Sequence, residues 1–299
     1  MAKGKGRTLR KRNEMDFSGI AHHPDVVRLI DLALEEDLSD VGDVTTQAIV
    51  NADQPDEGWI VAREDMVLAG LPVAEAVFVR VSKKLKVTGL AADGDDVVAG
   101  TRIMHIQGPA AAILTGERLA LNFLQRLCGV ATITRRFVDQ VVEGVQVLDT
   151  RKTTPGFRML EKYAVKCGGG TNHRIGLYDQ VLIKDNHLDH WVTEGQKTLA
   201  AAVRVAREKF PELMIEVETD TLDQVRQVLE AKPDWILLDN MSNDDLRQAV
   251  ALCKGVCFTE ASGGVNLATI AAISETGVDA ISVGALTHSS PAMDLAMDF

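Results

Sequence analysis

The stretch MIEVETDTLDQVRQVLEAKPDWILLDN, residues 214–240, contains two short apolar strands with an amphipathic helix between them. Strands that are separated by a helix of this length favour parallel pairing through a crossover connection. Each strand ends in a carboxylate, Glu218 in the first and Asp239 in the second. Two acidic side chains are therefore expected at the same edge of one parallel sheet.

The same alternation continues on both sides of this stretch. The expected strands are residues 145–149, 181–184, 214–218, 235–239, 256–259 and 280–283. The expected helices are residues 194–209, 222–231, 243–254 and 267–276. Such a series forms either an incomplete barrel or an open doubly wound sheet. No strand is followed by the glycine fingerprint of a dinucleotide-binding sheet, and this favours the barrel.

Polar residues and glycines follow the ends of these strands. They are Lys184, Glu218, Asp239, the run Ser262-Gly263-Gly264, and Gly284. The carboxyl ends of barrel strands converge on one face, which carries the active site in this architecture. The pattern predicts one common pocket at that face.

The first part of the chain has a different pattern. Helices are expected over residues 24–38, 72–81 and 110–127, and strands over residues 58–63, 66–69, 85–89 and 102–107. This pattern is typical of an α+β sandwich with an antiparallel sheet. The expected fold class is α/β, an incomplete α/β barrel (128–287) with an N-terminal sandwich domain (24–127), preceded by a basic, disordered tail (1–23).

Composition limits the classes of function. The chain has 299 residues and a formal net charge of −11, which argues against general nucleic-acid binding. No apolar run is long enough to span a bilayer, and no apolar segment follows the basic start as in a secretory signal. Four cysteines form neither a disulfide framework nor a zinc set. We expect a cytoplasmic protein without a membrane or nucleic-acid partner.

One region is basic within this acidic chain. Residues 151–184 contain seven Lys or Arg against only Glu161 and Asp179. Arginine and lysine near strand ends suit a ligand with several negative charges. The candidate anion-binding residues are Arg151, Lys152, His173, Arg174 and Lys184. A solvated helix face is the alternative for Arg158, Lys162 and Lys166.

Two further groups complete the candidate site. Alternation along the strand places Glu216 and Glu218 on one face, and Glu218 with Asp239 could hold a divalent cation or a ribose. Salt bridges to nearby lysines are the alternative. Ser262, Gly263 and Gly284 could hold a phosphate through backbone N–H groups, with a helix expected to begin near Val265.

Read together, these motifs resemble the quinolinate phosphoribosyltransferase family. The matching pieces are Glu117-Arg118 with Leu121-Asn122, DTRKTTPG (149–156), GGGTNHR (168–174), LIKDNH (182–187), EVE (216–218), LLDN (237–240), SGG (262–264) and VGALTH (283–288). They cover most of the chain from Pro24 onward, in the order of the family. Cys128 departs from the family, which usually has serine there.

The resemblance implies transfer of a phosphoribosyl group from phosphoribosyl pyrophosphate to quinolinate. Decarboxylation then gives nicotinate mononucleotide, carbon dioxide and pyrophosphate, a step of NAD biosynthesis. It also implies that residues 288–299 return to the N-terminal domain, and that the protein is a homodimer or larger homo-oligomer in which Arg118 enters the partner's site.

Roles for single residues follow from the resemblance as well. Quinolinate and phosphates are expected to contact Arg118, Arg151, Lys152, His173, Arg174 and Lys184. Glu218 and Asp239 are expected to contact the ribose and its Mg²⁺, and with Lys184 they are the expected catalytic residues. Ser262, Gly263 and Gly284 are expected to hold the 5-phosphate.

Three alternatives remain. The same barrel could act on another heterocyclic acid. A protein without catalytic activity could sense phosphorylated metabolites, although no charged position of the motifs is lost. A barrel aldolase could use Lys184 as a Schiff-base lysine.

Overall fold

The chain divides into two compact units in the computed structural model, which describes residues 15–191 and 198–299. Within the described residues, unit 1 contains 137–151 and 171–284, and unit 2 contains 16–136, 152–170 and 285–299. No helix of the described ranges is both long and apolar enough to cross a membrane.

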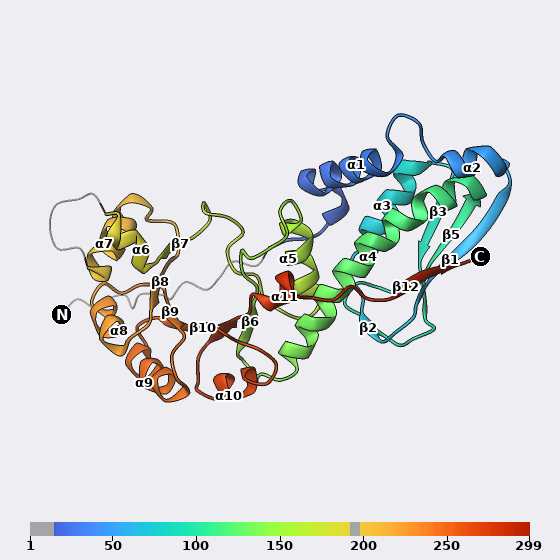
Figure 1. The fold of residues 1–299 in the computed structure, drawn as a ribbon. Coiled ribbons are helices and arrows are strands. Elements are labelled where there is room, and N and C mark those ends of the chain that lie inside the picture. The colour runs from blue at the N-terminus through green and yellow to red at the C-terminus, as the bar shows by residue number, and fades with distance from the viewer. Residues whose placement is uncertain (1–14, 192–197) are drawn as a thin grey trace, which may run out of the picture. The chain divides into compact units, whose positions relative to one another are not determined.

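Unit 1 is built on a six-stranded parallel sheet with the strand order β6-β11-β10-β9-β8-β7 (Figure 1). The strands are β6 (Gln146–Leu148), β7 (Val181–Ile183), β8 (Ile215–Thr219), β9 (Trp235–Asp239), β10 (Phe258–Ser262) and β11 (Ala280–Ser282). Strands β6 and β7 lie at the two ends of this order, so the sheet is an incomplete α/β barrel with fewer than eight strands. The expected fold class is confirmed.

Helices connect most of these strands, as the sequence predicts. They are α6 (Asp185–Asp189), α7 (Leu199–Lys209), α8 (Leu222–Leu229), α9 (Asn243–Cys253) and α10 (Ile270–Ser274). Neighbouring helices pack on each other in chain order from α7 to α10. Part of the helix expected over 194–209 lies outside the described residues. The helix expected near Val265 is absent there, because the chain turns until α10 begins at Ile270.

An apolar cluster lies where several barrel strands begin. Trp235 opens β9 and Phe258 opens β10, and their rings stack with centroids 4.9 Å apart. Leu148, Ala280 and Met214 pack in the same cluster. Burial of this apolar surface stabilises the barrel where β9, β10 and β11 begin.

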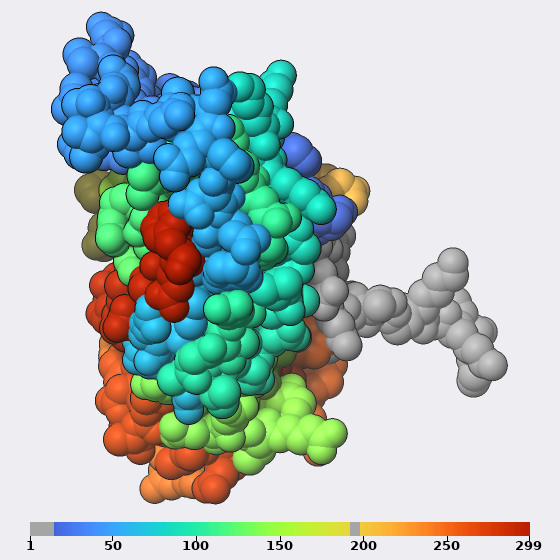
Figure 2. Space-filling model, turned by 90° about the vertical axis from the view of Figure 1, so that its right-hand side faces the viewer, coloured from blue at the N-terminus to red at the C-terminus, as the bar shows by residue number. Residues whose placement is uncertain are grey.

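Unit 2 contains an antiparallel sheet with the order β12-β1-β5-β3. Its strands are β1 (Pro55–Ala62), β3 (Lys86–Gly89), β5 (Arg102–Pro109) and β12 (Leu295–Asp298), and β2 (Met66–Val67) pairs separately with β4 (Asp96–Val97). The C-terminal strand β12 pairs with β1, and Figure 2 shows the red C-terminal atoms against the light-blue atoms of β1.

The helices of unit 2 supply most of its core. They are η1 (Ile20–His22), α1 (Pro24–Leu38), α2 (Val44–Ile49), α3 (Leu71–Val81), α4 (Ala110–Val138, of which the last two residues fall in unit 1), α5 (Arg158–Cys167) and α11 (Ala285–His288). Phe78 of α3 and Leu121, Leu124 and Leu127 of α4 are buried. Gly129 is required on α4, because a Cβ there would lie 1.8 Å from the carbonyl oxygen of Pro291.

The compact units and the sequence-based domains divide the chain differently. Residues 152–170 belong to unit 2, whereas the sequence places them in the barrel domain. The tail predicted over 1–23 is too long at its C-terminal end, because η1 forms there and buries Ile20 and Ala21. The rest of that tail, residues 1–14, lies outside the described residues.

Candidate functional site

The carboxyl ends of β7, β8 and β9 bring three of the predicted residues to one edge of the sheet. Parallel pairing sets Ile183 opposite Val217, so Lys184 and Glu218 follow side by side. The ammonium of Lys184 donates to the carboxylate of Glu218, and both side chains are partly exposed (39% and 18%). Asp239 ends the next strand and is also partly buried. A cation and two carboxylates thus border the same strand ends.

The carboxyl ends of the parallel strands β9 and β10 lie close together. Asp239 lies opposite Ser262 in the sheet, and the N–H of Asn240 donates to the Ser262 carbonyl at 2.9 Å. Gly263 follows with φ +96°, and a Cβ there would lie 2.1 Å from Oδ1 of Asn240. Only glycine therefore fits at position 263. Its small size allows the backbone of residues 262–264 to lie close to the carboxyl end of β9.

The loop between α5 and β7 contains His173 and Arg174. The carboxylate of Asp149 accepts the backbone N–H of His173 at 2.9 Å and the side-chain amide of Asn172 at 2.6 Å. Asp149 is fully buried, and Asn172 and His173 are nearly so. Paired buried polar groups of this kind fix the loop geometry. Arg151 and Arg174 are partly buried in the same unit.

The His173 ring lies between two buried carboxylates. Nε2 is 3.1 Å from Oε2 of Glu216 and 3.5 Å from Oε2 of Glu260. Nδ1 accepts the backbone N–H of Arg174 at 2.7 Å. The neutral ring therefore carries its proton on Nε2, where it donates toward the carboxylates.

These three side chains also lie close enough to be considered as a metal site. A neutral histidine cannot accept a hydrogen bond at Nδ1 and ligate a cation through Nε2, because no ring nitrogen would then carry the proton. We therefore interpret the cluster as a hydrogen-bonded group. The donor set that fits a hard cation is the pair Glu218 and Asp239, which offers carboxylate oxygens at a partly exposed edge.

The sequence predicted some residues of the hydrogen-bonded group around His173 better than others. Alternation along β8 indicated that Glu216 shares a face with Glu218. Gln180 was missed, although its amide donates to Glu216 at 2.5 Å and its carbonyl accepts from Nη1 of Arg174 at 3.1 Å. No local pattern marks Gln180, because its partner is 36 residues away.

The remaining predicted residues lie in unit 2 and at the end of β11. Lys152 is exposed, and its backbone carbonyl accepts the hydroxyl of Thr287 at 2.8 Å. Arg118 is exposed on α4. Gly284 follows β11 and is partly buried. The alternative that Lys162 lies on a solvated helix face is wrong, because its side chain is fully buried on α5.

A buried ion pair supports the loop after Lys152. Nη2 of Arg126 is 2.7 Å from Oε1 of Glu161, whose side chain is fully buried. Glu161 also accepts the N–H of Thr154 at 3.1 Å and its hydroxyl at 2.9 Å. Arg126 further donates to the carbonyls of Thr287 and Ser290. One arginine thus connects the loop after Lys152 with the segment around α11.

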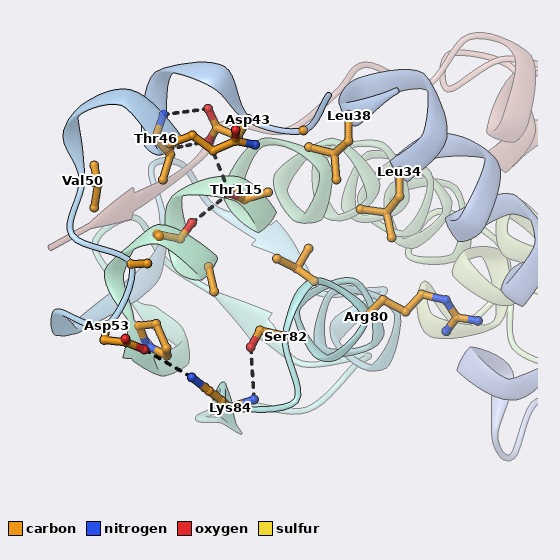
Figure 3. A pocket seen from close by; sticks show the side chains of 17 residues that line it. Leu34, Leu38, Asp43, Thr46, Val50, Asp53, Arg80, Ser82, Lys84 and Thr115 are labelled. Carbon is orange, nitrogen blue, oxygen red and sulfur yellow. Dashed lines mark hydrogen bonds and ion pairs between the residues drawn. The ribbon is translucent and has the colours of Figure 1, made fainter. Parts of the chain in front are cut away.

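Unit 2 also contains a pocket between α1, α2 and the start of α4 (Figure 3). Leu34 and Leu38 form part of its wall, and Lys84 pairs with Asp53 at 3.3 Å. Asp43 accepts hydrogen bonds from Thr46 and Thr115 (Figure 3). The bonds from Thr46 lower the pKa of Asp43. The polar groups drawn in this pocket therefore bind mainly one another.

The barrel with cationic and carboxylate side chains at the carboxyl ends of its strands defines an enzyme for an anionic substrate. Comparison with family models is more specific. Residues 43–128 match the quinolinate phosphoribosyl transferase N-terminal domain, and residues 130–298 match the C-terminal domain. The chain belongs to the quinolinate phosphoribosyltransferase family.

Individual relatives agree with the family models. Quinolinate phosphoribosyltransferase [decarboxylating] 2 of Nicotiana glauca, described as mitochondrial, is 41% identical over 292 residues, covering 92% of this chain and 83% of that protein. A probable nicotinate-nucleotide pyrophosphorylase [carboxylating] of Bacillus subtilis (strain 168) is 41% identical over 281 residues, covering 93% and 94%. The solved nicotinate-nucleotide pyrophosphorylase of Francisella tularensis superposes with a TM-score of 0.86 at 40% identity, covering 93% and 98%.

Proposed function

We propose that this chain transfers a phosphoribosyl group from phosphoribosyl pyrophosphate to quinolinate and releases carbon dioxide and pyrophosphate. The product is nicotinate mononucleotide, an intermediate of NAD biosynthesis. The proposal is carried by one observation: Lys184, Glu218 and Asp239 lie at the carboxyl ends of three neighbouring strands of the barrel. The names of the relatives support this reaction.

Quinolinate carries two carboxylates, which need cationic partners. We assign them to Arg151, Arg174 and Lys184 of unit 1, with Lys152 as a further contact for the phosphates. Arginine can form two parallel hydrogen bonds to a carboxylate, whereas lysine offers a compact charge. Partial exposure of Arg151, Arg174 and Lys184 leaves them accessible to a ligand.

The ribose and pyrophosphate are assigned to the other side of the site. Glu218 and Asp239 would contact the ribose hydroxyls and hold Mg²⁺, directly or through water. When bound, Mg²⁺ would neutralise charge on the pyrophosphate leaving group. Ser262, Gly263 and Gly284 would hold the 5-phosphate, because the glycine backbone allows N–H groups to approach an anion.

The reaction needs positioning more than an activated side chain. The pyridine nitrogen attacks the anomeric carbon while the bond to pyrophosphate breaks, and the sugar develops positive charge. The fixed carboxylates of Glu218 and Asp239 stabilise that charge, and Lys184 stabilises the anionic groups. As carbon dioxide leaves, the electron pair of the broken bond stays on C2, where the adjacent cationic nitrogen stabilises it, and a proton from solvent then forms the C2–H bond of nicotinate mononucleotide.

The proposed assembly is a homodimer or a larger homo-oligomer in which Arg118 enters the site of the partner. The exposed position of Arg118 on α4 supports this assignment. We also propose a cytoplasmic location, because the four cysteines of the sequence do not have the pattern of a disulfide framework. Relatives from plants include proteins described as mitochondrial or chloroplastic.

The test is a product assay with purified protein, phosphoribosyl pyrophosphate, Mg²⁺ and quinolinate. We expect nicotinate mononucleotide from quinolinate, and no nucleotide when nicotinate replaces it. Turnover of another heterocyclic acid with none of quinolinate would contradict the substrate assignment. Binding of both substrates without any product would instead favour a sensor. A Schiff base on Lys184 that borohydride traps would favour an aldolase.

A further inference from the structure

Arg174 is held at two points by its own unit. Its backbone N–H donates to Nδ1 of His173 at 2.7 Å, and Nη1 of its guanidinium donates to the backbone carbonyl of Gln180 at 3.1 Å. A long arginine side chain loses much of its rotamer freedom when it is fixed. Contacts that fix it before the ligand arrives therefore reduce the cost of binding an anion.

The two points of attachment are themselves joined through Glu216. The side-chain amide of Gln180 donates to Oε2 of Glu216 at 2.5 Å, and Nε2 of His173 lies 3.1 Å from the same oxygen. The contacts thus form a closed ring from Arg174 through Gln180, Glu216 and His173 back to Arg174. Within it, the side-chain bond to Glu216 fixes Gln180, whose backbone carbonyl accepts from Arg174. His173 and Gln180 are at least nine-tenths buried and Glu216 is fully buried, whereas Arg174 is only partly buried.

These hydrogen bonds give His173 a different role from the substrate contact that the family resemblance implies. Both ring nitrogens already have protein partners, so the neutral imidazole offers no further N–H to a substrate carboxylate. Its backbone N–H is also engaged, by Asp149 at 2.9 Å. The imidazole of His173 is therefore placed to orient the backbone at Arg174.

We propose that Glu216 and Gln180 are positioning residues that orient Arg174 for the anionic substrate through this ring of hydrogen bonds, with His173 as the connecting member. The inference rests on the proposed function for its substrate, quinolinate. Because these residues act through Arg174, their loss is expected to weaken substrate binding more than it slows the chemical step.

A charge exchange tests the link between Gln180 and Glu216. Gln180→Glu sets two carboxylates against each other, and we expect the KM for quinolinate to rise about tenfold or more while kcat falls less. In the exchanged variant Gln180→Glu/Glu216→Gln, the amide now at position 216 can donate to the carboxylate now at position 180 and accept from His173. We expect this variant to return to within about threefold of wild type. Gln180→Met, which removes the donor without adding charge, replaces Gln180→Glu if that variant does not fold.

The Arg174→Ala background separates positioning from general damage. If Gln180 acts through Arg174, Gln180→Glu should change the KM less than about twofold when Arg174 is already absent. An equal increase in both backgrounds, or no rescue by the exchanged variant, would overturn the proposal. Thermal unfolding of each variant checks that the fold is retained.

A spectroscopic readout tests the ring independently of catalysis. In protein with ¹⁵N-labelled histidine, we expect the His173 signals to show a protonated Nε2 and an unprotonated Nδ1. A proton on Nδ1 of His173 would contradict the proposed ring of hydrogen bonds. A wild-type protein with the expected tautomer but no turnover of quinolinate would contradict the proposed function alone.

Discussion

The ammonium of Lys184 pairs with the carboxylate of Glu218 across the ends of two neighbouring strands. Both side chains are partly exposed (39% and 18%), so a ligand can reach the pair. An exposed ion pair contributes little to stability, about 1 kcal/mol or less. The pair therefore contributes little to the fold, and these two residues are the best positions at which to test the proposed site.

Substitution at Lys184 or Glu218 should affect the rate far more than the fold. We expect Lys184→Ala and Glu218→Ala each to lower kcat/KM by about two orders of magnitude or more, because each removes charge that stabilises the transition state. The melting temperature should change by only a few degrees. Lys254→Ala, at an exposed lysine after α9, is the matched control and should keep wild-type turnover. Near-normal turnover in both site variants would refute their assignment.

Gly263→Ala should disturb the proposed phosphate loop. Its φ of +96° disfavours a side chain, and the new Cβ would collide with Asn240. Gly144→Ala is the control, because Gly144 has a similar φ of +93° but open space around it. Gly144→Ala should lose about 1 kcal/mol of stability from its backbone conformation alone, and Gly263→Ala should lose more because of the collision. In kinetic assays, only Gly263→Ala should raise the KM for phosphoribosyl pyrophosphate, by about tenfold or more. Equal KM values in the two variants would contradict a phosphate site at Gly263.

Removal of one partner from the Arg126–Glu161 pair should destabilise unit 2. Arg126→Ala leaves the fully buried Glu161 without its cation, at a cost of about 3 kcal/mol or more in the free energy of unfolding. Urea unfolding measures this change. Arg226→Ala, which removes an exposed pair with Asp223 on α8, should cost less than about 0.5 kcal/mol. Similar losses for the two variants would show that burial of the pair does not matter.

Buried thiols predict the behaviour of the protein at high pH. Burial raises the pKa of Cys128 and of Cys167 to about 12, and raises the pKa of Tyr163 as well. A group with a raised pKa in the folded state stabilises the fold below its unfolded pKa of about 9 and loses this contribution as the pH rises further. The free energy of unfolding should therefore fall between about pH 9 and pH 12. Unchanged stability across this range would contradict the burial of these groups.

Thiol reactivity checks the same groups directly. Because the thiolate is the reactive form, Cys128 and Cys167 should react slowly with a thiol reagent at pH 8 in the folded protein and rapidly after unfolding. Cys128→Ser, which carries the residue usual in the family, should retain the fold. The thiol of Cys128 lies close to the backbone of Ala69, with Sγ 3.4 Å from its N–H and 3.5 Å from its carbonyl, and a hydroxyl can form similar bonds.

Local sequence patterns predicted much of the barrel. Strand β9 has the predicted bounds Trp235–Asp239, because five residues with four apolar side chains follow Pro233 and end at a carboxylate. Helix α1 has the predicted bounds Pro24–Leu38, with proline at its first position. By contrast, β12 was not predicted as a strand, because it exists through pairing with β1, more than 200 residues earlier.

The same limit applies to the site. Lys184, Glu218 and Asp239 were predictable, because each follows an apolar strand that places it at a common edge. Gln180 and the burial of Lys162 were not, because both depend on neighbours from distant parts of the sequence. The tautomer of His173 likewise depends on Glu216 and Glu260 from two other strands.

Carbon dioxide release from quinolinate labelled in its 2-carboxylate tests the central claim most directly. With phosphoribosyl pyrophosphate and Mg²⁺ present, we predict one labelled carbon dioxide for each nicotinate mononucleotide formed by the wild-type protein, and almost none with Lys184→Ala. Labelled carbon dioxide at the wild-type rate from Lys184→Ala, or none from the wild type, would contradict a decarboxylating transfer at these strand ends.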